Sequence, residues 1–144
     1  RYDKENKYMP EFDRYLAELK AEVMQEAKYH FDTENWRKCA TFSKNVQRLD
    51  PNDISAVLLK ATAEWRGKNV YQAETTIGEA KTALDNFTAS SVTSEGKPAY
   101  RFALMEFAEL MKEEGRKADA APFLDAVEPV LGGDKEFDNF MASY

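Results

Sequence analysis

A spacing of 34 residues repeats along this chain and restricts the folds open to it. Apolar or small residues at three positions of one segment have counterparts 34 positions later in the same order. Trp36, Cys39 and Val46 correspond to Val70, Ala73 and Ala80. A fixed period of this length is typical of stacked helix–turn–helix pairs, because each pair needs a neighbour to bury its apolar face. Such arrays offer extended surfaces to other molecules, so the spacing predicts recognition rather than chemistry.

Apolar residues at helical spacing predict an all-α chain, and no segment of useful length alternates as a strand does. The first helix is expected to run from about Glu11 to Phe31, with Pro10 at its first position, where a missing N–H costs nothing. The run 50–53 ends one helix and caps the next, because the residue before Pro51 avoids helical backbone. Gly67 is expected to end another helix in a left-handed conformation.

Two prolines and a polar stretch mark the C-terminal half. Pro122 fits a helix only if that helix starts near Asp119, and Pro129 is expected to kink or end it. Residues 88–97 are small and polar, which indicates an exposed loop. Phe137, Phe140, Met141 and Tyr144 predict a short final helix that covers the end of the stack.

The charge distribution argues against two classes of partner. The chain of 144 residues has a net charge of −6. Residues 28–68 carry 8 basic and 5 acidic side chains, whereas residues 69–144 carry 7 and 14. A nucleic-acid binder usually has a concentrated basic stripe, and no run approaches the ~18 apolar residues of a membrane span. We therefore expect no nucleic-acid partner and no membrane insertion, and the acidic half suits a basic or dipolar partner.

Cys39 is the only cysteine, so an internal disulfide is excluded. This favours the reducing cytoplasm, with the periplasm as the alternative. The chain starts at Arg1 without an initiator methionine, which suggests a fragment of a longer protein or a processed product.

Residues that could support catalysis or hold a metal are sparse. His30 is the only histidine, and a zinc site needs three or four ligands. Cys39 falls where helices are expected to cross, so a buried, inert thiol is favoured over a nucleophile. We therefore expect no metal, no cofactor and no enzymatic activity.

Small residues lie where the helices of each expected pair would cross. They are Ala27 and Cys39 in the first pair, Ala61 and Ala73 in the second, and Ala108 and Ala120 in the third. Pro51 closes the first pair, and Trp36 holds an aromatic site. In these features the chain resembles the tetratricopeptide repeat, a pair of antiparallel helices about 34 residues long. The sequence departs from that pattern at Glu34, where glycine is usual, and by 13 additional residues between Ala73 and Ala120.

The resemblance implies a right-handed superhelical array of three tetratricopeptide-like antiparallel helix pairs with a C-terminal capping helix. Residues 1–10 would form an N-terminal segment, and residues 11–134 the repeat domain. The three units would span about 11–53, 54–97 and 98–134, and residues 135–144 would form the cap.

The resemblance also implies a concave groove lined by the first helix of each unit. The family's groove positions fall on Met24, Lys28, Phe31, Leu58, Thr62, Trp65, Phe102, Met105, Glu109 and Lys112. Because this set is largely apolar, we expect a scaffold or adaptor that binds an apolar or amphipathic peptide or helix of another protein. A chaperone-tail carboxylate clamp is disfavoured, since only Lys28 is basic at the clamp positions and Glu106 has the wrong sign. The alternative is a structural block of a larger multi-subunit assembly, with the groove filled by its own chain.

Overall fold

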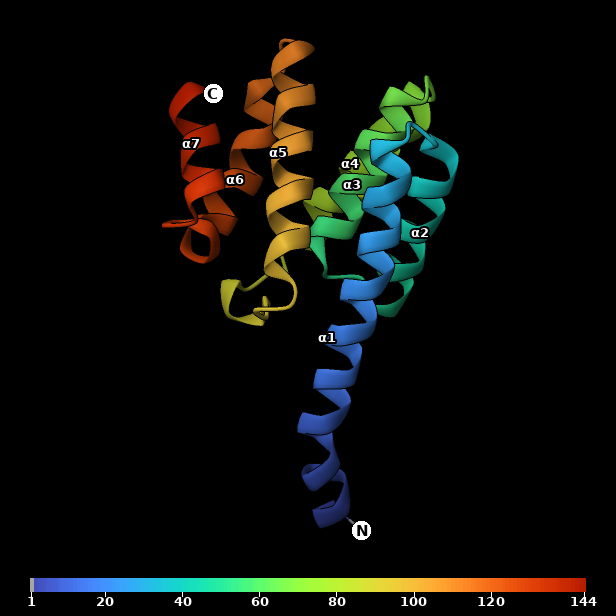
Figure 1. The fold of residues 1–144 in the computed structure, drawn as a ribbon, viewed down its shortest axis with the longest axis vertical. Coiled ribbons are helices and arrows are strands. Elements are labelled where there is room, and N and C mark those ends of the chain that lie inside the picture. The colour runs from blue at the N-terminus through green and yellow to red at the C-terminus, as the bar shows by residue number, and fades with distance from the viewer. Residues whose placement is uncertain (1) are drawn as a thin grey trace.

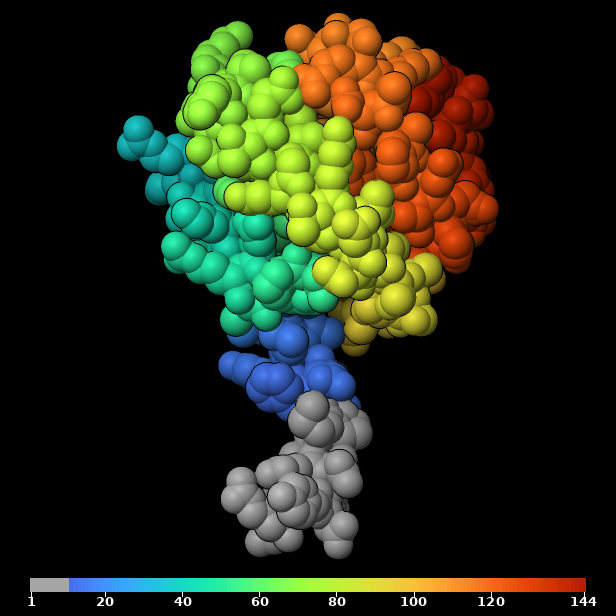
Figure 2. All heavy atoms as spheres, turned by 180° about the vertical axis from the view of Figure 1, so that it is seen from behind, coloured from blue at the N-terminus to red at the C-terminus, as the bar shows by residue number. Residues whose placement is uncertain are grey.

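The computed structural model describes the backbone of residues 2–144 and the side chains of residues 11–144. This part of the chain is helical and contains no β-strand. Its elements are α1 (Tyr2–Asp32), α2 (Trp36–Leu49), α3 (Ile54–Arg66), α4 (Val70–Leu84), the short 3₁₀ turn η1 (Ala89–Ser91), α5 (Lys97–Glu113), α6 (Lys117–Leu131) and α7 (Lys135–Ser143). Helices α1, α3 and α5 face one side of the molecule (Figure 1), and α2, α4 and α6 cover the other (Figure 2).

Helix α1 is longer than expected. Its backbone is helical from Tyr2, so most of the segment 1–10 continues the first helix instead of preceding it. Residues 2–9 contain no glycine, and their two lysines and one glutamate favour helix. The N-terminal half of α1 projects beyond the body of the molecule (Figure 1). As a result the side chains of Phe12 and Tyr15 are 57% and 62% exposed.

The same turn joins the helices of all three pairs. Its left-handed residue is Glu34, Lys68 or Gly115, with φ of 60°, 71° and 72°. In each turn the residue directly after the left-handed one closes the loop with a backbone hydrogen bond: Asn35 N–H to His30 O (2.7 Å), Asn69 N–H to Glu64 O (2.9 Å) and Arg116 N–H to Met111 O (2.7 Å). The first two turns are 34 residues apart, so the sequence period is also a period of the backbone.

Gly67 does not have the role expected from the sequence. Its φ is −80°, and the left-handed position belongs to Lys68. A Cβ atom at Gly67 would lie 3.0 Å from Trp36 Cβ and 3.1 Å from Ala63 O. Glycine is therefore required there for the close approach of α2 to the end of α3, because a side chain would collide with both neighbours.

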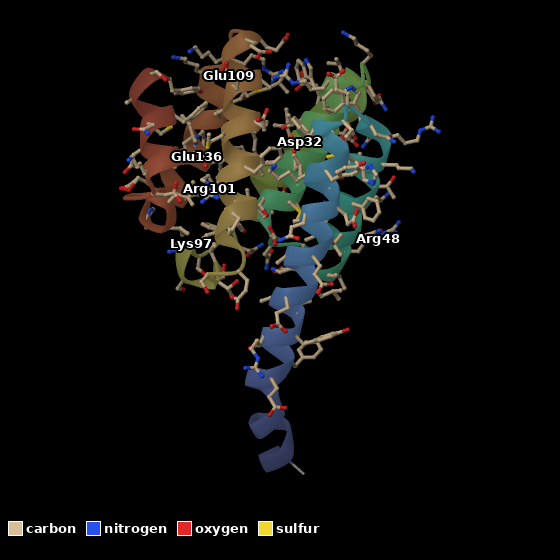
Figure 3. All side chains as sticks on the ribbon, in the orientation of Figure 1. Asp32, Arg48, Lys97, Arg101, Glu109 and Glu136 are labelled. Atoms are coloured by element: carbon tan, nitrogen blue, oxygen red, sulfur yellow. The ribbon has the colours of Figure 1, made fainter. Side chains whose placement is uncertain are left out.

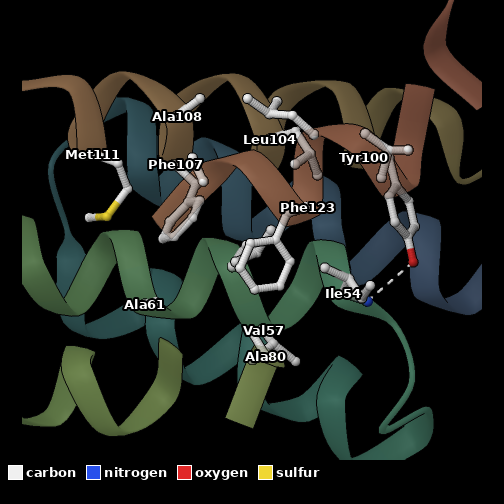
Figure 4. Packing of buried hydrophobic residues seen from close by; sticks show 14 of the residues in the cluster. Ile54, Val57, Ala61, Ala80, Tyr100, Leu104, Phe107, Ala108, Met111 and Phe123 are labelled. Atoms are coloured by element: carbon white, nitrogen blue, oxygen red, sulfur yellow. Dashed lines mark hydrogen bonds between the residues drawn. The ribbon is translucent and has the colours of Figure 1, made fainter. Parts of the chain in front are cut away.

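Helix α3 occupies the centre of the molecule. It packs against α2, α4 and α5, and every residue from Ile54 to Ala63 is buried. One apolar cluster joins α3 to α4, α5, α6 and α7 (Figure 4), and a second joins it to α1, α2 and Ala103 of α5. The six small residues at the expected helix crossings, Ala27, Cys39, Ala61, Ala73, Ala108 and Ala120, are all at most 1% exposed. Small side chains permit this close approach of neighbouring helices.

Aspartate and asparagine side chains begin four of the helices. Asn35, Asp53, Asn69 and Asp134 each accept a hydrogen bond from the backbone N–H three residues later, which satisfies a donor that the helix leaves unpaired. The expected cap at 50–53 is therefore confirmed at Asp53.

Helix α6 tolerates both of its prolines. It starts at Lys117 and continues through Pro122 and Pro129 to Leu131, so Pro129 does not end the helix where it stands. Both prolines are exposed, so water can reach the backbone carbonyls that they leave without a helical partner. The buried side of α6 is formed by Ala120, Phe123, Leu124, Val127 and Leu131.

Helix α7 follows the last helix pair and packs against α5. Phe137 is 3% exposed, and Asp134 at the start of α7 pairs with Arg101 of α5 at 2.8 Å. Across the part of the chain that the structure describes, none of the helices has the length and apolar character of a membrane span.

Overpacking of the α2–α3 contact should destabilise the fold. Ala63 is fully buried in the cluster that contains Met24 and Cys39. Ala63→Leu should lower the free energy of unfolding by roughly 1–3 kcal/mol, because the extra methyl groups find no space. Ala118→Leu is the control, since Ala118 is exposed on α6, and a change within about 0.5 kcal/mol is expected there. Urea unfolding followed by circular dichroism measures both, and equal effects would contradict the packing described.

Candidate binding groove

A groove runs between α1 and α5 on the front of the molecule. Figure 1 shows the two helices with α3 behind the space that separates them, and the hollow has a volume of about 270 Å³. Met24 of α1 and Leu59 of α3 lie at the bottom of the hollow with only 4% and 0% of their surface exposed, so the half-buried ring of Phe102 of α5 is the main apolar surface that the groove presents. The full lining is Ala21, Met24, Gln25, Lys28, Leu59, Glu95, Pro98, Ala99, Arg101, Phe102 and Glu136.

An aromatic contact joins the two walls at one end of the groove. Phe31 packs edge-on against Phe102, with ring centroids 5.3 Å apart, and against Trp36 at 5.0 Å. The Lys28 ammonium lies 4.9 Å from the Phe102 centroid and 3.0 Å from Asp32 Oδ2. Phe102 is therefore held on one side by α1, while its remaining surface is available to the groove.

Charged side chains form the rim at the opposite end. Arg101 contacts Asp134 at 2.8 Å and Glu136 at 3.6 Å, so α7 contributes directly to the groove. Arg101 and Glu136 lie next to each other in Figure 3, near Lys97 at the start of α5. Glu95 completes this end of the lining. An apolar centre between charged ends can receive an apolar side chain flanked by polar groups.

Beyond Phe102, α5 presents a row of carboxylates. Burial raises the pKa of Glu106, the Arg66 guanidinium opposes that change, and Asp32 adds to it through like charge. Arg66 itself is bound by Glu113, with contacts of 2.8 Å and 3.3 Å. This bond lowers the pKa of Glu113. The surface next to the groove is thus acidic, and Arg66 is largely committed to Glu113.

The structure separates the ten predicted groove residues into different environments. Met24, Lys28 and Phe102 line the groove, and Phe31 supports Phe102 from below while only 8% exposed. Trp65 is half-buried beneath the Arg116 guanidinium, which lies 5.2 Å from its ring. Met105, Glu109 and Lys112 lie further along α5 and are not part of the groove lining.

Leu58 and Thr62 are packing residues, which corrects their assignment as groove residues. Both have no exposed surface, and the Thr62 hydroxyl donates a hydrogen bond to Leu58 O at 2.7 Å. The cause is the central position of α3, which packs against α2, α4 and α5, so these two side chains are covered by neighbouring helices.

Sequence reasoning missed several residues of the groove. Leu59 is the neighbour of the predicted Leu58, and the one-residue difference turns the side chain to another face of α3. Arg101 and Glu136 could not be placed in advance, because the position of α7 relative to α5 is a tertiary feature. The family pattern contains no signal for either residue.

A second hollow, of about 250 Å³, lies where α1, the α2–α3 turn and the start of α5 meet. Lys20 contacts Asp50 at 2.8 Å and Asp53 at 3.1 Å. The Ile54 N–H donates to the Tyr100 hydroxyl at 3.2 Å (Figure 4), and burial raises the pKa of Tyr100. These groups are satisfied by one another, so we interpret the hollow as a polar joint between helices.

The only histidine and the only cysteine, the residue types most often used in catalysis and metal binding, pack against other side chains here. His30 stacks on Phe42 with ring centroids 5.3 Å apart. Cys39 is buried, and desolvation raises the pKa of its thiol to about 12, so it is protonated and unreactive at neutral pH. Within residues 11–144, no group of three or more histidine, cysteine, aspartate or glutamate side chains is placed to hold a metal ion.

Comparisons with known proteins do not identify a family for this chain. No protein-family model, curated protein or solved structure matches this chain. The tetratricopeptide resemblance therefore depends on features such as the buried Ala27 and Ala61 and the repeated turn at Glu34 and Lys68.

Neutralising Glu106 should stabilise the protein at neutral pH. A carboxyl whose pKa is higher in the folded than in the unfolded chain costs stability while ionised, and this cost fades as the pH falls through the folded pKa. Glu106→Gln should therefore raise the midpoint of thermal unfolding at pH 7, and the difference should shrink toward pH ~4, near the ordinary pKa of glutamate.

Glu113→Gln serves as the matched control for that variant. Glu113 lies on the same helix, but its pKa is lowered by Arg66, so its charge is stabilising. The midpoint of Glu113→Gln at pH 7 should stay the same or fall. A rise of equal size in both variants would contradict the electrostatic description of this surface.

Proposed function

We propose that this protein is a scaffold or adaptor that binds an apolar or amphipathic segment of another protein in the groove between α1 and α5. The observation that carries the proposal is the half-buried ring of Phe102, which lies with the buried Met24 and Leu59 in one hollow that has charged ends. Aromatic anchors in such settings contribute disproportionately to protein interfaces. The volume of about 270 Å³ suits one or two side chains rather than a whole helix.

A tetratricopeptide-like superhelix is the arrangement that we infer for the three helix pairs. It is supported by the turn that recurs at Glu34, Lys68 and Gly115 and by the buried small residues at the helix crossings. Arrays of this kind build curved recognition surfaces from neighbouring pairs. On this basis we propose that the protein has no enzymatic activity. We also propose a cytoplasmic location, for which Cys39 as the only cysteine is the sole support.

A second function has its own support. Phe12 and Tyr15 are exposed on the projecting part of α1, and Tyr29 is 60% exposed on the same helix. Apolar side chains along one helix are often buried against another polypeptide. This observation favours a structural block of a larger assembly, in which α1 contacts a neighbouring subunit and the groove has no external ligand.

The two functions predict different results in a peptide selection. A random peptide library displayed on phage should yield sequences with apolar anchors on the wild-type protein. Phe102→Ala should weaken the selected peptide by about 30-fold, as expected for loss of a central anchor worth ~2 kcal/mol. Tyr71→Ala is the control, since Tyr71 is 86% exposed on α4, on the side of the molecule opposite the groove. The affinity of this variant for the selected peptide should be unchanged. Fluorescence anisotropy measures the affinities.

Affinities are compared only for variants whose circular dichroism spectrum matches that of the wild-type protein. If no peptide is enriched, or if Phe102→Ala binds as well as wild type, the groove is not the binding site. In that case the structural role is the better explanation, and it predicts that replacing Phe12 and Tyr15 by serine abolishes assembly with the neighbouring subunit.

A further inference from the structure

Helix α2 carries an unusual charge for this acidic protein. Its 14 residues include Arg37, Lys38, Lys44 and Arg48 and no acidic residue. Arg37, Lys44 and Arg48 are separated by seven and four residues, so they share one helix face. All three are exposed, and none of them forms an ion pair with any other residue in the range 11–144. We name these three residues the basic ridge.

An open groove lies beside this ridge, between α2 and α4 and above α3. Its volume is about 480 Å³, and Arg37 and Lys44 of the ridge line one wall. Gln72 of α4 and Asn69, which caps that helix, line the other wall, and Lys60 of α3 lies at the bottom. This groove is separate from the one between α1 and α5 and belongs to other helices.

The Lys60 ammonium is buried but incompletely paired. Its side chain is 7% exposed, and its two contacts, to Gln47 Oε1 and Glu79 Oε1, are both 3.4 Å long. Hydrogen bonds between an ammonium and a carboxylate are normally ~2.7–2.9 Å, and an ammonium has three donors. Lys60 therefore retains capacity for a further acceptor in the groove that it lines.

The carboxylate of Glu64 also lines this groove, but it is already engaged. It accepts a hydrogen bond from the Thr76 hydroxyl at 2.6 Å, on the α4 side. Burial raises its pKa, which the nearby Lys60 and Lys44 partly offset. The charges around the groove are thus three cations and one carboxylate, an excess of positive charge.

Acidic side chains restrict the width of the basic surface. Glu22 and Glu26 of α1 lie beside Phe42 of α2 on one side, and Glu79 of α4 bonds to Gln47 of α2 on the other. At physiological salt, charges act over about 8 Å, so a wide polyanion such as a duplex or a membrane surface would also meet these carboxylates. A narrow, extended polypeptide could contact the basic ridge without approaching the flanking carboxylates.

We propose that the basic ridge, together with the groove floored by Lys60, binds an extended acidic segment of another protein. The carboxylates of that segment would pair with Arg37, Lys44 and Arg48, and one would reach Lys60. The ridge spans 11 residues from Arg37 to Arg48, or about 16 Å of helix. About five extended residues cover that distance.

A labelled glutamate peptide tests the proposal directly. Fluorescence anisotropy of a fluorescein-labelled peptide of about eight glutamates should show binding to the wild-type protein that weakens as salt is added, and a glutamine peptide of the same length should not bind. The double variant R37E/K44E should bind at least about tenfold more weakly, because two attractions become repulsions.

The control is the double variant K97E/K135E, which changes the net charge by the same amount. Both lysines are exposed and lie outside the groove lined by Lys60, and Lys97 and Arg48 are on opposite sides of the molecule (Figure 3). The affinity of this control should stay within about twofold of wild type. Phe102→Ala should also bind the glutamate peptide normally, which separates this site from the groove between α1 and α5.

Four outcomes would overturn the proposal. The first is that the glutamate peptide does not bind, and the second is that R37E/K44E and K97E/K135E lose affinity for it equally. The third is that the protein binds a DNA duplex or phosphatidylserine vesicles more tightly than the peptide. The fourth is that the protein self-associates and that R37E/K44E abolishes this association. If R37E/K44E fails to fold, the neutral pair R37Q/K44Q takes its place and should show a smaller loss than charge reversal. Wild-type affinity in that folded pair would equally refute the proposal.

Discussion

The burial of α3 on all sides is the constraint on which the rest of the structure depends. Ten consecutive residues, from Ile54 to Ala63, have almost no contact with solvent, because α2, α4 and α5 pack around the helix. Alanines at 56, 61 and 63 allow the neighbouring backbones to approach. The only long charged side chain in this stretch, Lys60, emerges at the back between α2 and α4, where Gln47 and Glu79 receive it.

This central position also determines the two faces of the molecule. On the front, α1 and α5 flank α3, and the groove between them has a volume of about 270 Å³ with Leu59 of α3 in its lining. On the back, α2 and α4 remain apart, which leaves the wider groove with Lys60 at the bottom. The groove on the front has an apolar centre with charged ends, and on the back the basic surface is confined to α2 and the groove beside it. Two partners of different chemistry could therefore be held at once, because the sites share no residue.

The repeat in the sequence corresponds to a repeat in the backbone, although the residues at equivalent positions differ. The left-handed residue of the turn is glutamate, lysine or glycine. Glutamate and lysine are unfavourable in this conformation, yet Asn35 and Asn69 immediately follow and cap the next helix. Within each of these pairs the first helix thus ends and the second begins within a few residues, and the strain is offset by the cap and by packing of the helices on either side.

Much of the fold was predictable from the sequence. The period of apolar residues located seven helices, and the six small residues at the crossings were identified before their burial was known, because close helix contact requires small side chains at fixed spacing. The start of α1 was missed, since Pro10 imitates a helix start. Pro129 does not end α6, which continues to Leu131, and its exposed position leaves the freed carbonyl accessible to water.

The candidate sites were only partly predictable, for a physical reason. Met24, Lys28 and Phe102 could be placed at the groove because helix position fixes the direction of a side chain. The covering of Leu58 and Thr62, the entry of Glu136 from α7 and the space between α2 and α4 depend on distances between helices. The sequence by itself determined the helices and the faces that they bury; the tertiary structure alone decided which faces remain open, because that choice depends on contacts between residues far apart in the chain.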